Sequence, residues 1–265
     1  MLRFTVLGCG SSAGVPRVAQ GWGACDPNNP KNRRRRCSLL VERIGTRGTT
    51  TVLVDTSPDL REQLLDAGVE KLDGVLFTHD HADHSHGIDD VRPLVLHQRR
   101  RVDVYLDATT SAALHAKFDY CFATPPGSDY PPIVTEHRIA DGAPITIEGE
   151  GGEITAIPYA QLHGTGTTLG FRFDNFAYSC DVSAISDDAA RQLENLDVWI
   201  LDALRYKPHP SHFSVDEALA WVERMKPRRA VLTNLHTDLD YETLRRSLPA
   251  NVEPAFDGMV IELTD

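Results

Sequence analysis

The chain lacks two features that would place it in a membrane or on a long nucleic acid. No apolar run in its 265 residues approaches the length that spans a bilayer, and residues 1–7 alternate like a strand, without the apolar core or cleavage site of a signal peptide. Positive charge is in deficit, with 27 Lys and Arg against 38 Asp and Glu and a net charge of −11. Because this average field repels a long polyanion, extended DNA or RNA is a poor partner. We expect a cytoplasmic protein without membrane contact.

Cysteines are few and odd in number. The five cysteines form no Cys-x-x-Cys pattern, so the sequence predicts no disulfide framework and favours a reducing compartment. The hydrophobic fraction of 41% and the charged fraction of 25% are ordinary for a globular protein. Predicted strands and helices alternate in both halves without a break in composition, which indicates one α/β domain over residues 1–265.

The most informative segment is 78–84, which reads Thr-His-Asp-His-Ala-Asp-His. It follows the apolar run 74–77, which predicts a short buried strand. In an extended chain, side chains two apart point the same way, so His79, His81 and Asp83 converge. His84 is adjacent to Asp83, so both side chains reach the same site only if the chain turns there. Gly87 and the helix-like residues 88–92 indicate that it does. Imidazole and carboxylate groups in this order predict a site for a divalent metal, Zn or Mn.

The pattern His-x-His-x-Asp-His after a strand resembles the signature of the metallo-β-lactamase fold. Further segments are most similar to the PhnP-type branch of that fold, cyclic-phosphodiester hydrolases related to ribonuclease Z. These segments are Leu7–Pro16, Asp181, His212–Ser214 and Phe256–Met259. The resemblance runs over nearly the whole chain. It implies a single αββα sandwich with a metal cleft at one edge of the sheets.

The resemblance also implies two divalent metal ions, Zn or Mn, and the residues that hold them. Carried over onto this sequence, the ligands are His79, His81 and His163 for one metal, Asp83, His84 and His236 for the second, and Asp181 as the bridge. Two ions about 3.5–4 Å apart would hold a bridging hydroxide that attacks the substrate. Asp83 is therefore also expected among the catalytic residues.

His236 departs from the family's pattern. The usual pattern places the last histidine directly after a Leu-Thr strand end, whereas Leu232-Thr233 is followed here by Asn234. His236 comes two residues later, and no other histidine lies downstream. Whether it completes the second metal site stays open. If it does not, the second metal would be weakly held.

Two residues are expected to assist catalysis without binding metal. Asp55 ends a predicted buried strand, and in the family an Asp here supports the metal ligands. His212 lies in a segment that, in PhnP and ribonuclease Z relatives, supplies a histidine to bind phosphate and protonate the leaving alkoxide. Imidazole suits that role because it titrates near neutral pH. His209 is the alternative.

Two other segments are candidates for contacts with the substrate. The glycine-rich loop 8–14 lies at the rim of the cleft in the family, which makes Ser11 a candidate. The run Arg33–Arg36 either faces solvent or turns one or two guanidinium groups, with Arg36 as the candidate, toward an anionic substrate. Better-known PhnP members carry a cysteine cluster for a structural zinc in the matching loop. Only Cys25 remains here, so that site is expected to be missing.

Residues 120–132 are rich in proline and aromatic residues and are not expected to form regular structure. They resemble a lid or rim element, but an inert surface loop and part of a subunit interface fit as well. A homodimer is therefore left open.

The leading hypothesis for function is a dinuclear metal-dependent phosphodiesterase acting on small nucleotide or ribose phosphodiesters, cyclic ones included. The alternative is hydrolysis of a thioester or lactone on the same fold, whose relatives typically lack an equivalent of the His212 segment. A tRNA 3′-processing nuclease is disfavoured by the acidic charge and by the lack of a recognisable tRNA-gripping arm. A non-catalytic binding protein is disfavoured because all seven ligand positions are filled.

Overall fold

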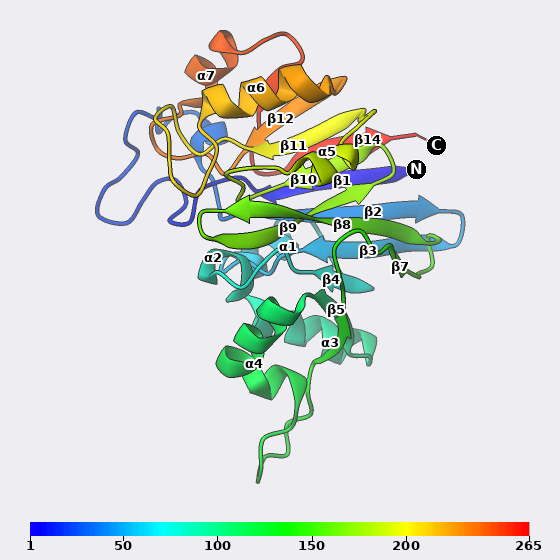
Figure 1. Ribbon diagram of the computed structural model, residues 1–265. Coiled ribbons are helices and arrows are strands. Elements are labelled where there is room, and N and C mark those ends of the chain that lie inside the picture. Colours follow the sequence, from blue (N-terminus) through cyan, green and yellow to red (C-terminus); the bar gives the residue numbers. More distant parts are fainter. Residues whose placement is uncertain (265) are drawn as a thin grey trace.

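Two seven-stranded sheets pack face to face, with helices on both outer faces (Figure 1). This arrangement is seen in a computed structural model that describes residues 1–264. It confirms the αββα sandwich expected from the sequence. No helix within residues 1–264 is long and apolar enough to cross a membrane.

The first sheet has the strand order β14-β1-β2-β3-β4-β5-β6. Its first three strands along the chain form antiparallel hairpins, and β3 to β6 run parallel. The last strand of the chain closes the sheet by pairing antiparallel with the first. The bounds are β1 Leu2–Gly8, β2 Ser38–Gly45, β3 Gly48–Val54, β4 Gly74–Leu76, β5 Val102–Leu106, β6 Val134–Arg138 and β14 Met259–Leu263.

The second sheet has the order β13-β12-β11-β10-β9-β8-β7, antiparallel from β7 to β10 and parallel from β10 to β13. β8 continues to His163, because it pairs with β9 up to Gly166. The bounds are β7 Ile145–Ile147, β8 Ile154–His163, β9 Gly166–Phe173, β10 Phe176–Ser179, β11 Val198–Asp202, β12 Arg229–Thr233 and β13 Val252–Pro254.

The helices cover the outer faces of the two sheets. Those following β3 to β5 pack on the first sheet, and those following β10 to β12 pack on the second (Figure 1). α6 begins with a capping box between Ser214 and Glu217, which fixes where the helix starts. The bounds are α1 Leu60–Asp66, α2 Ala82–Ser85, α3 Arg92–Gln98, α4 Ala108–Phe122, α5 Asp187–Arg191, α6 Val215–Met225 and α7 Tyr241–Ser247, with single 3-10 turns at Pro30–Asn32 and Ile88–Val91.

The main core lies between the sheets and is built from the inward-facing residues of alternating strands. Phe4 of β1 stacks on Phe176 of β10 with ring centroids 3.6 Å apart, and Phe173 meets the same ring edge-on. These contacts join the sheets, so the ends of strands in one sheet are fixed relative to those in the other.

Polar residues at one edge of the sandwich follow strand ends in a left-handed conformation. Asp55, Asp181 and Asn234 come within two residues after β3, β10 and β12, and their φ angles are 64°, 54° and 62°. Asp and Asn tolerate this conformation better than most residues, and such strained positions gather at functional sites. The carboxyl ends of β3, β4, β10, β11 and β12 therefore define the edge at which to look for the site.

Candidate metal centre and its cavity

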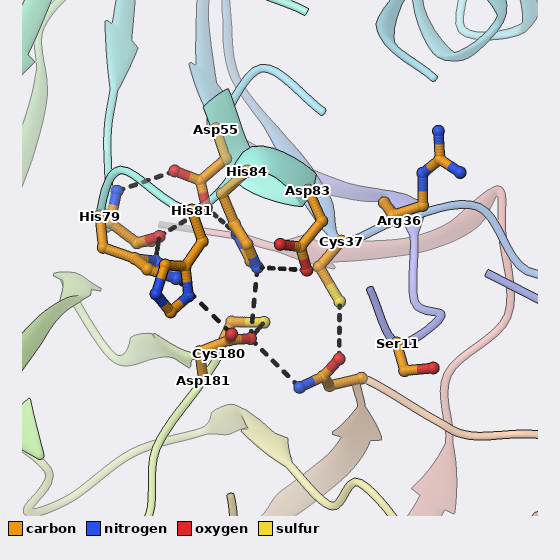
Figure 2. A network of polar contacts seen from close by, with 12 residues as sticks. Ser11, Arg36, Cys37, Asp55, His79, His81, Asp83, His84, Cys180 and Asp181 are labelled. Carbon is orange, nitrogen blue, oxygen red and sulfur yellow. Dashed lines mark hydrogen bonds and ion pairs between the residues drawn. The ribbon is translucent and has the colours of Figure 1, made fainter. Parts of the chain in front are cut away.

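Four of the predicted ligands meet at this edge. His79, His81, His163 and Asp181 each place one ligand atom within 4.8 Å of the others. Figure 2 shows three of them, His79, His81 and Asp181, lying together. Two come from the loop after β4, one from the end of β8, and one follows β10. Sequence segments about 80 and 100 residues apart are thus brought together by the two sheets.

Asp181 turns its two carboxylate oxygens in different directions. Oδ2 lies 3.6 Å from Nε2 of His79 and 3.7 Å from Nε2 of His163. Oδ1 lies 3.3 Å from Nε2 of His84, which is itself 3.5 Å from Oδ2 of Asp83. The carboxylate therefore stands between two groups of nitrogen and oxygen ligands, which is the geometry that a bridging ligand requires.

The far nitrogens of these rings are held by the protein. Nδ1 of His84 lies 2.7 Å from Oδ2 of Asp55, and Nδ1 of His163 lies 2.6 Å from the carbonyl of Ser211. Nδ1 of His79 lies 2.9 Å from Oγ1 of Thr78, which donates to Asp55. Such contacts orient a ligating imidazole and leave its Nε2 for a metal. The structure thus places Asp55 beside two predicted ligands, as the sequence led us to expect.

Two buried nitrogens face carboxylate oxygens at ion-pair distance but form no hydrogen bond within residues 1–264. Nε2 of His79 and Nε2 of His84 are shielded from solvent, and neither donates nor accepts a hydrogen bond within residues 1–264. A buried polar atom without a partner is costly, so two of them facing one carboxylate indicate a missing cation. Neutral imidazole and carboxylate are ligands that Zn and Mn accept. The residues present therefore fit divalent metal.

Charge in the centre favours the metal-binding protonation state at His79 and Asp181 but not at His84. Burial would lower the pKa of His84, but the charges of Asp181, Asp83 and Asp55 outweigh it and raise that pKa well above its usual value. Burial lowers the pKa of His79 well below its usual value, and the neighbouring His84 lowers it further, so the ring is neutral near pH 7. Burial alone would raise the pKa of Asp181, but His84 and His79 outweigh it and hold the pKa well below its usual range. The carboxylate is thus ionised.

His236 is not among the groups of converging ligands found in residues 1–264, although it lines the same cavity. Nδ1 of His236 contacts its own turn, 3.1 Å from Asp238 and 3.2 Å from Thr237. Asn234 contacts the centre instead, with Nδ2 3.1 Å from Oδ1 of Asp181. The structure thus places Asn234, and not His236, in contact with Asp181, because Asn234 directly follows β12.

His212 is held beside the metal ligands by a carboxylate that the sequence analysis passed over. Nδ1 of His212 lies 2.8 Å from Oδ2 of Asp202, and the His212 ring lies against that of His163 with centroids 4.6 Å apart. His209 packs behind it at 5.2 Å. Asp202 ends β11 as Asp55 follows β3, and this shared position at a buried strand end was the signal that could have identified it.

A cavity of about 350 Å³ opens over these residues. Two arginines that sequence reasoning missed, Arg17 and Arg205, line it together with the predicted Ser11, and Nη2 of Arg17 donates to Oγ of Ser11 at 3.3 Å. Burial lowers the pKa of His236, which lines the same cavity, and the charges of both arginines lower it further. The full lining is Ser11, Ser12, Arg17, His81, Asp83, His163, Asp181, Leu204, Arg205, His209, Ser211, His212, Asn234 and His236. Residues 120–132 take no part in it.

The predicted substrate contact of Arg36 is not supported. Its Nε forms an ion pair with Asp59 at 2.9 Å, and the side chain points away from the histidines (Figure 2). Within the same run, Arg35 pairs with Asp66 and Arg33 is exposed. Arg35 and Arg36 therefore form ion pairs and Arg33 faces solvent, because successive residues of this bridged segment point to opposite sides.

Arg34, the remaining member of the run, is 2% exposed and joins two loops. Its Nη2 donates to the carbonyl of Leu239 at 2.7 Å and to Oδ1 of Asn32 at 3.1 Å, and Nη1 donates to the carbonyl of His236 at 3.3 Å. Cys25 lies in the same pocket, 3.8 Å from Nη1. In this chain a buried guanidinium thus ties the loop before β2 to the turn after β12.

Comparisons with known proteins agree with the fold and the centre. Residues 50–234 match the sequence model of a family described as "Beta-lactamase superfamily domain". A crystal structure described as a new diphosphatase from the PhnP family is 36% identical, with a TM-score of 0.88, and the match covers 98% of this chain and 96% of that one. Zn²⁺-bound PqqB from Methylobacterium extorquens shares the fold at 16% identity and a TM-score of 0.76, over 98% and 100% of the two chains.

One relative is described as an enzyme of another class, a transferase. An octanoyltransferase from Porphyromonas gingivalis (strain ATCC BAA-308 / W83) is 30% identical over 263 residues, which are 97% of this chain but 51% of the relative. The chain thus spans about half the length of that protein. The short form of human tRNase Z shares the fold at 16% identity, with a TM-score of 0.68 over 99% and 100% of the chains. From the family match and the near full-length likeness to the PhnP-family structure, this chain belongs to the β-lactamase superfamily and, within it, to the PhnP family.

Proposed function

We propose that this protein is a metal-dependent hydrolase of small phosphorylated substrates, most of all nucleotide-like phosphodiesters or phosphoanhydrides. The observation that carries the proposal is the joint placement of Asp181 between two ligand groups and of His212 beside them, in one cavity. The likeness to a PhnP-family diphosphatase at 36% identity supports phosphorus over carbon as the reacting centre.

Each part of the centre has a separate task in this proposal. One ion would be held by His79, His81 and His163, and the other by Asp83 and His84. Asp181 would bind both ions. Bound divalent ions would lower the pKa of water and neutralise charge on the phosphoryl oxygens. Asp55 keeps Nε2 of His84 directed at the centre, and the Ser211 carbonyl does the same for His163.

His212 would act as the proton donor to the leaving oxygen. Asp202 holds Nδ1, so Nε2 is the atom left to face a substrate. Burial would lower the pKa of His212, but the hydrogen bond and charge of Asp202 outweigh it and raise the pKa, so the imidazolium is well populated near neutral pH. An alkoxide is a poor leaving group and needs this proton.

The size and charge of the cavity favour a small anion. A volume of about 350 Å³ suits a ligand near the lower end of the usual range for small molecules. Arg17 and Arg205 make the cavity locally positive although the chain carries a net charge of −11. A long nucleic acid would meet the acidic remainder of the surface.

A substrate panel on metal-reconstituted protein tests the proposal. It contains bis-p-nitrophenyl phosphate, a 2′,3′-cyclic nucleotide, a dinucleotide joined by a diphosphate, an octanoyl thioester and a lactone. We expect turnover of phosphorus substrates that a chelator abolishes and Zn or Mn restores. Turnover of the thioester or lactone alone would overturn the proposal.

His212→Ala sharpens the same test. The rate on a substrate with an alkoxide leaving group should fall by roughly 10²–10⁴-fold, the usual share of general acid catalysis. The loss should be smaller for bis-p-nitrophenyl phosphate, whose phenolate leaves without a proton. An equal loss on both substrates would assign His212 to binding rather than proton transfer.

Acyl-thioester hydrolysis is the second candidate, and the name of the curated relative is the observation that favours it. That name describes a protein about twice as long as this chain, so the transferase activity can reside in the half that this chain does not match. The octanoyl thioester in the panel distinguishes the two candidates directly.

A further inference from the structure

Arg17 and Arg205 have no carboxylate partner among residues 1–264, unlike Arg35 and Arg36, which pair with Asp66 and Asp59. Arg205 directs its guanidinium to two backbone carbonyls, those of Lys207 at 3.1 Å and Pro208 at 2.9 Å. Arg17 donates only to Oγ of Ser11, and its Nε is buried without a hydrogen-bond partner. In a protein with 38 acidic residues, two arginines left unpaired in one cavity indicate that an anion supplies the missing charge.

Backbone hydrogen bonds hold both arginines in place. Arg17 and Gly21 exchange two backbone hydrogen bonds of 2.9 and 2.8 Å, which close a tight turn, and Gly21 meets its φ of 71° without strain. Leu204, beside Arg205, accepts from the backbone N–H of His236 at 3.0 Å and donates to the carbonyl of Phe213 at 2.9 Å. The cationic side of the cavity is thus built from fixed backbone and not from free surface side chains.

This cationic side adjoins the metal ligands without overlapping them. The N–H of Ser11 donates to the carbonyl of Leu235 at 3.3 Å, so the loop that carries Arg17 runs along the turn after β12. On that turn Asn234 contacts Asp181, whereas His236 lines the cavity together with the two arginines. An anion on the arginines would therefore lie next to, and not on, the anion held by the metal ligands.

We propose that Arg17 and Arg205 form a second anion subsite, so that the substrate carries two phosphoryl groups in series. The inference rests on the proposed function and narrows its substrate to a phosphoanhydride. The phosphorus above the metal ligands gains the water oxygen and loses its bond to the bridging oxygen, whose electron pair leaves with the second phosphoryl group. The protons of the water remain on the two phosphate products or pass to solvent. The guanidinium groups stabilise the charge on the departing group.

Binding of matched nucleotides to the metal-loaded protein tests this inference. Adenosine 5′-monophosphate is compared with adenosine 5′-(α,β-methylene)diphosphate, which cannot be hydrolysed between its phosphorus atoms, and Kd is measured by calorimetry. We expect the diphosphate analogue to bind about 10–100-fold more tightly, as two charge-assisted contacts allow. Arg17→Ala and Arg205→Ala should each lower that preference about tenfold, and Arg17→Lys should restore part of it because it keeps the charge but not the planar fork.

Arg33→Ala is the matched control, because it removes the same charge from an exposed side chain outside the cavity. It should leave the preference and the hydrolysis of bis-p-nitrophenyl phosphate unchanged, and thermal melting checks that every variant is folded. Equal affinity for the two nucleotides in a protein that hydrolyses bis-p-nitrophenyl phosphate would overturn the second subsite and leave the proposed function standing. A protein that hydrolyses no phosphorus substrate overturns the proposed function, whatever the nucleotides do. An equal loss of preference in Arg33→Ala would show a general charge effect and overturn the inference.

Discussion

Oδ2 of Asp202 lies 2.8 Å from Nδ1 of His212, and the other oxygen of the same carboxylate accepts from Nδ2 of Asn234 at 3.2 Å. Asp202 also accepts from the backbone N–H of Val182 through Oδ2 at 3.0 Å. The Asp202 carboxylate thus contacts Val182, His212 and Asn234. A shift of Asp202 would move all three together, which makes it the positioning residue of the cavity.

Asp202→Asn should change the pH profile as well as the rate. A proton donor is active below its pKa, so activity on an alkoxide-leaving substrate falls as pH rises through the pKa of His212. Asp202 raises that pKa against the opposing effect of burial, so removing its charge should move the alkaline limb of kcat/KM to lower pH. The rate at the optimum should fall about 10–100-fold, as for other residues that orient an active group. If Asp202→Asn is slower but the alkaline limb of its kcat/KM profile does not move, Asp202 has a structural role only.

Asp181→Ala should lower the metal content. Because its two oxygens face different ligand groups, both ions lose a ligand together. We expect the wild type to hold close to two divalent ions per chain and the variant clearly fewer, measured by elemental analysis after gel filtration. A full complement in Asp181→Ala contradicts the bridging role. Asp59→Ala is a control, since its carboxylate pairs with Arg36 outside the centre.

Arg34→Ala should destabilise the fold. The substitution leaves the carbonyls of Leu239 and His236 without their donor in a buried position and opens a cavity beside Cys25. We expect a loss of about 2–4 kcal/mol in the free energy of unfolding, measured by urea denaturation. Arg33→Ala removes the same charge from the surface and should stay within about 0.5 kcal/mol of the wild type. Similar losses in both variants would show that net charge, and not buried hydrogen bonding, sets the effect.

The sequence predicted the fold, and the convergence of candidate metal ligands, best where the signal is local. Segment 78–84 contains four ligand candidates within six residues, and the strand before it fixes which way they point. The hairpin of β2 and β3 and the start of α6 follow from turn and capping residues. By contrast, the pairing of β14 with β1 depends on register between strands about 250 residues apart, which no local pattern encodes.

The cavity wall was harder to predict for the same reason. Arg17 stands in a polar loop and Arg205 after a buried strand, and neither belongs to a motif. Only the fold brings them to one cavity. The arginine run attracted a functional interpretation because it is conspicuous in the sequence, yet its members make ion pairs, a buried anchor and an exposed side chain. A run of arginines in the sequence does not by itself predict an anion site, because the fold decides which guanidinium groups are left without a carboxylate partner.

The second metal position provides the last prediction, since Asn234 occupies the place after the Leu-Thr strand end. Asn234 directs its amide Nδ2, which cannot ligate a metal, at Asp181, so this position supplies no imidazole and the second ion should bind less tightly than the first. Asn234→His should tighten Zn at the second position by about 10–100-fold in competition with a chelator. The backbone allows this change, because histidine also tolerates the φ of 62° found at this position. His236→Ala should leave both metal affinities within about threefold of the wild type, because His236 belongs to none of the groups of converging ligand atoms in residues 1–264. If His236→Ala loses the second ion while Asn234→His binds it no more tightly, then His236 reaches the metal and Asn234 only supports Asp181.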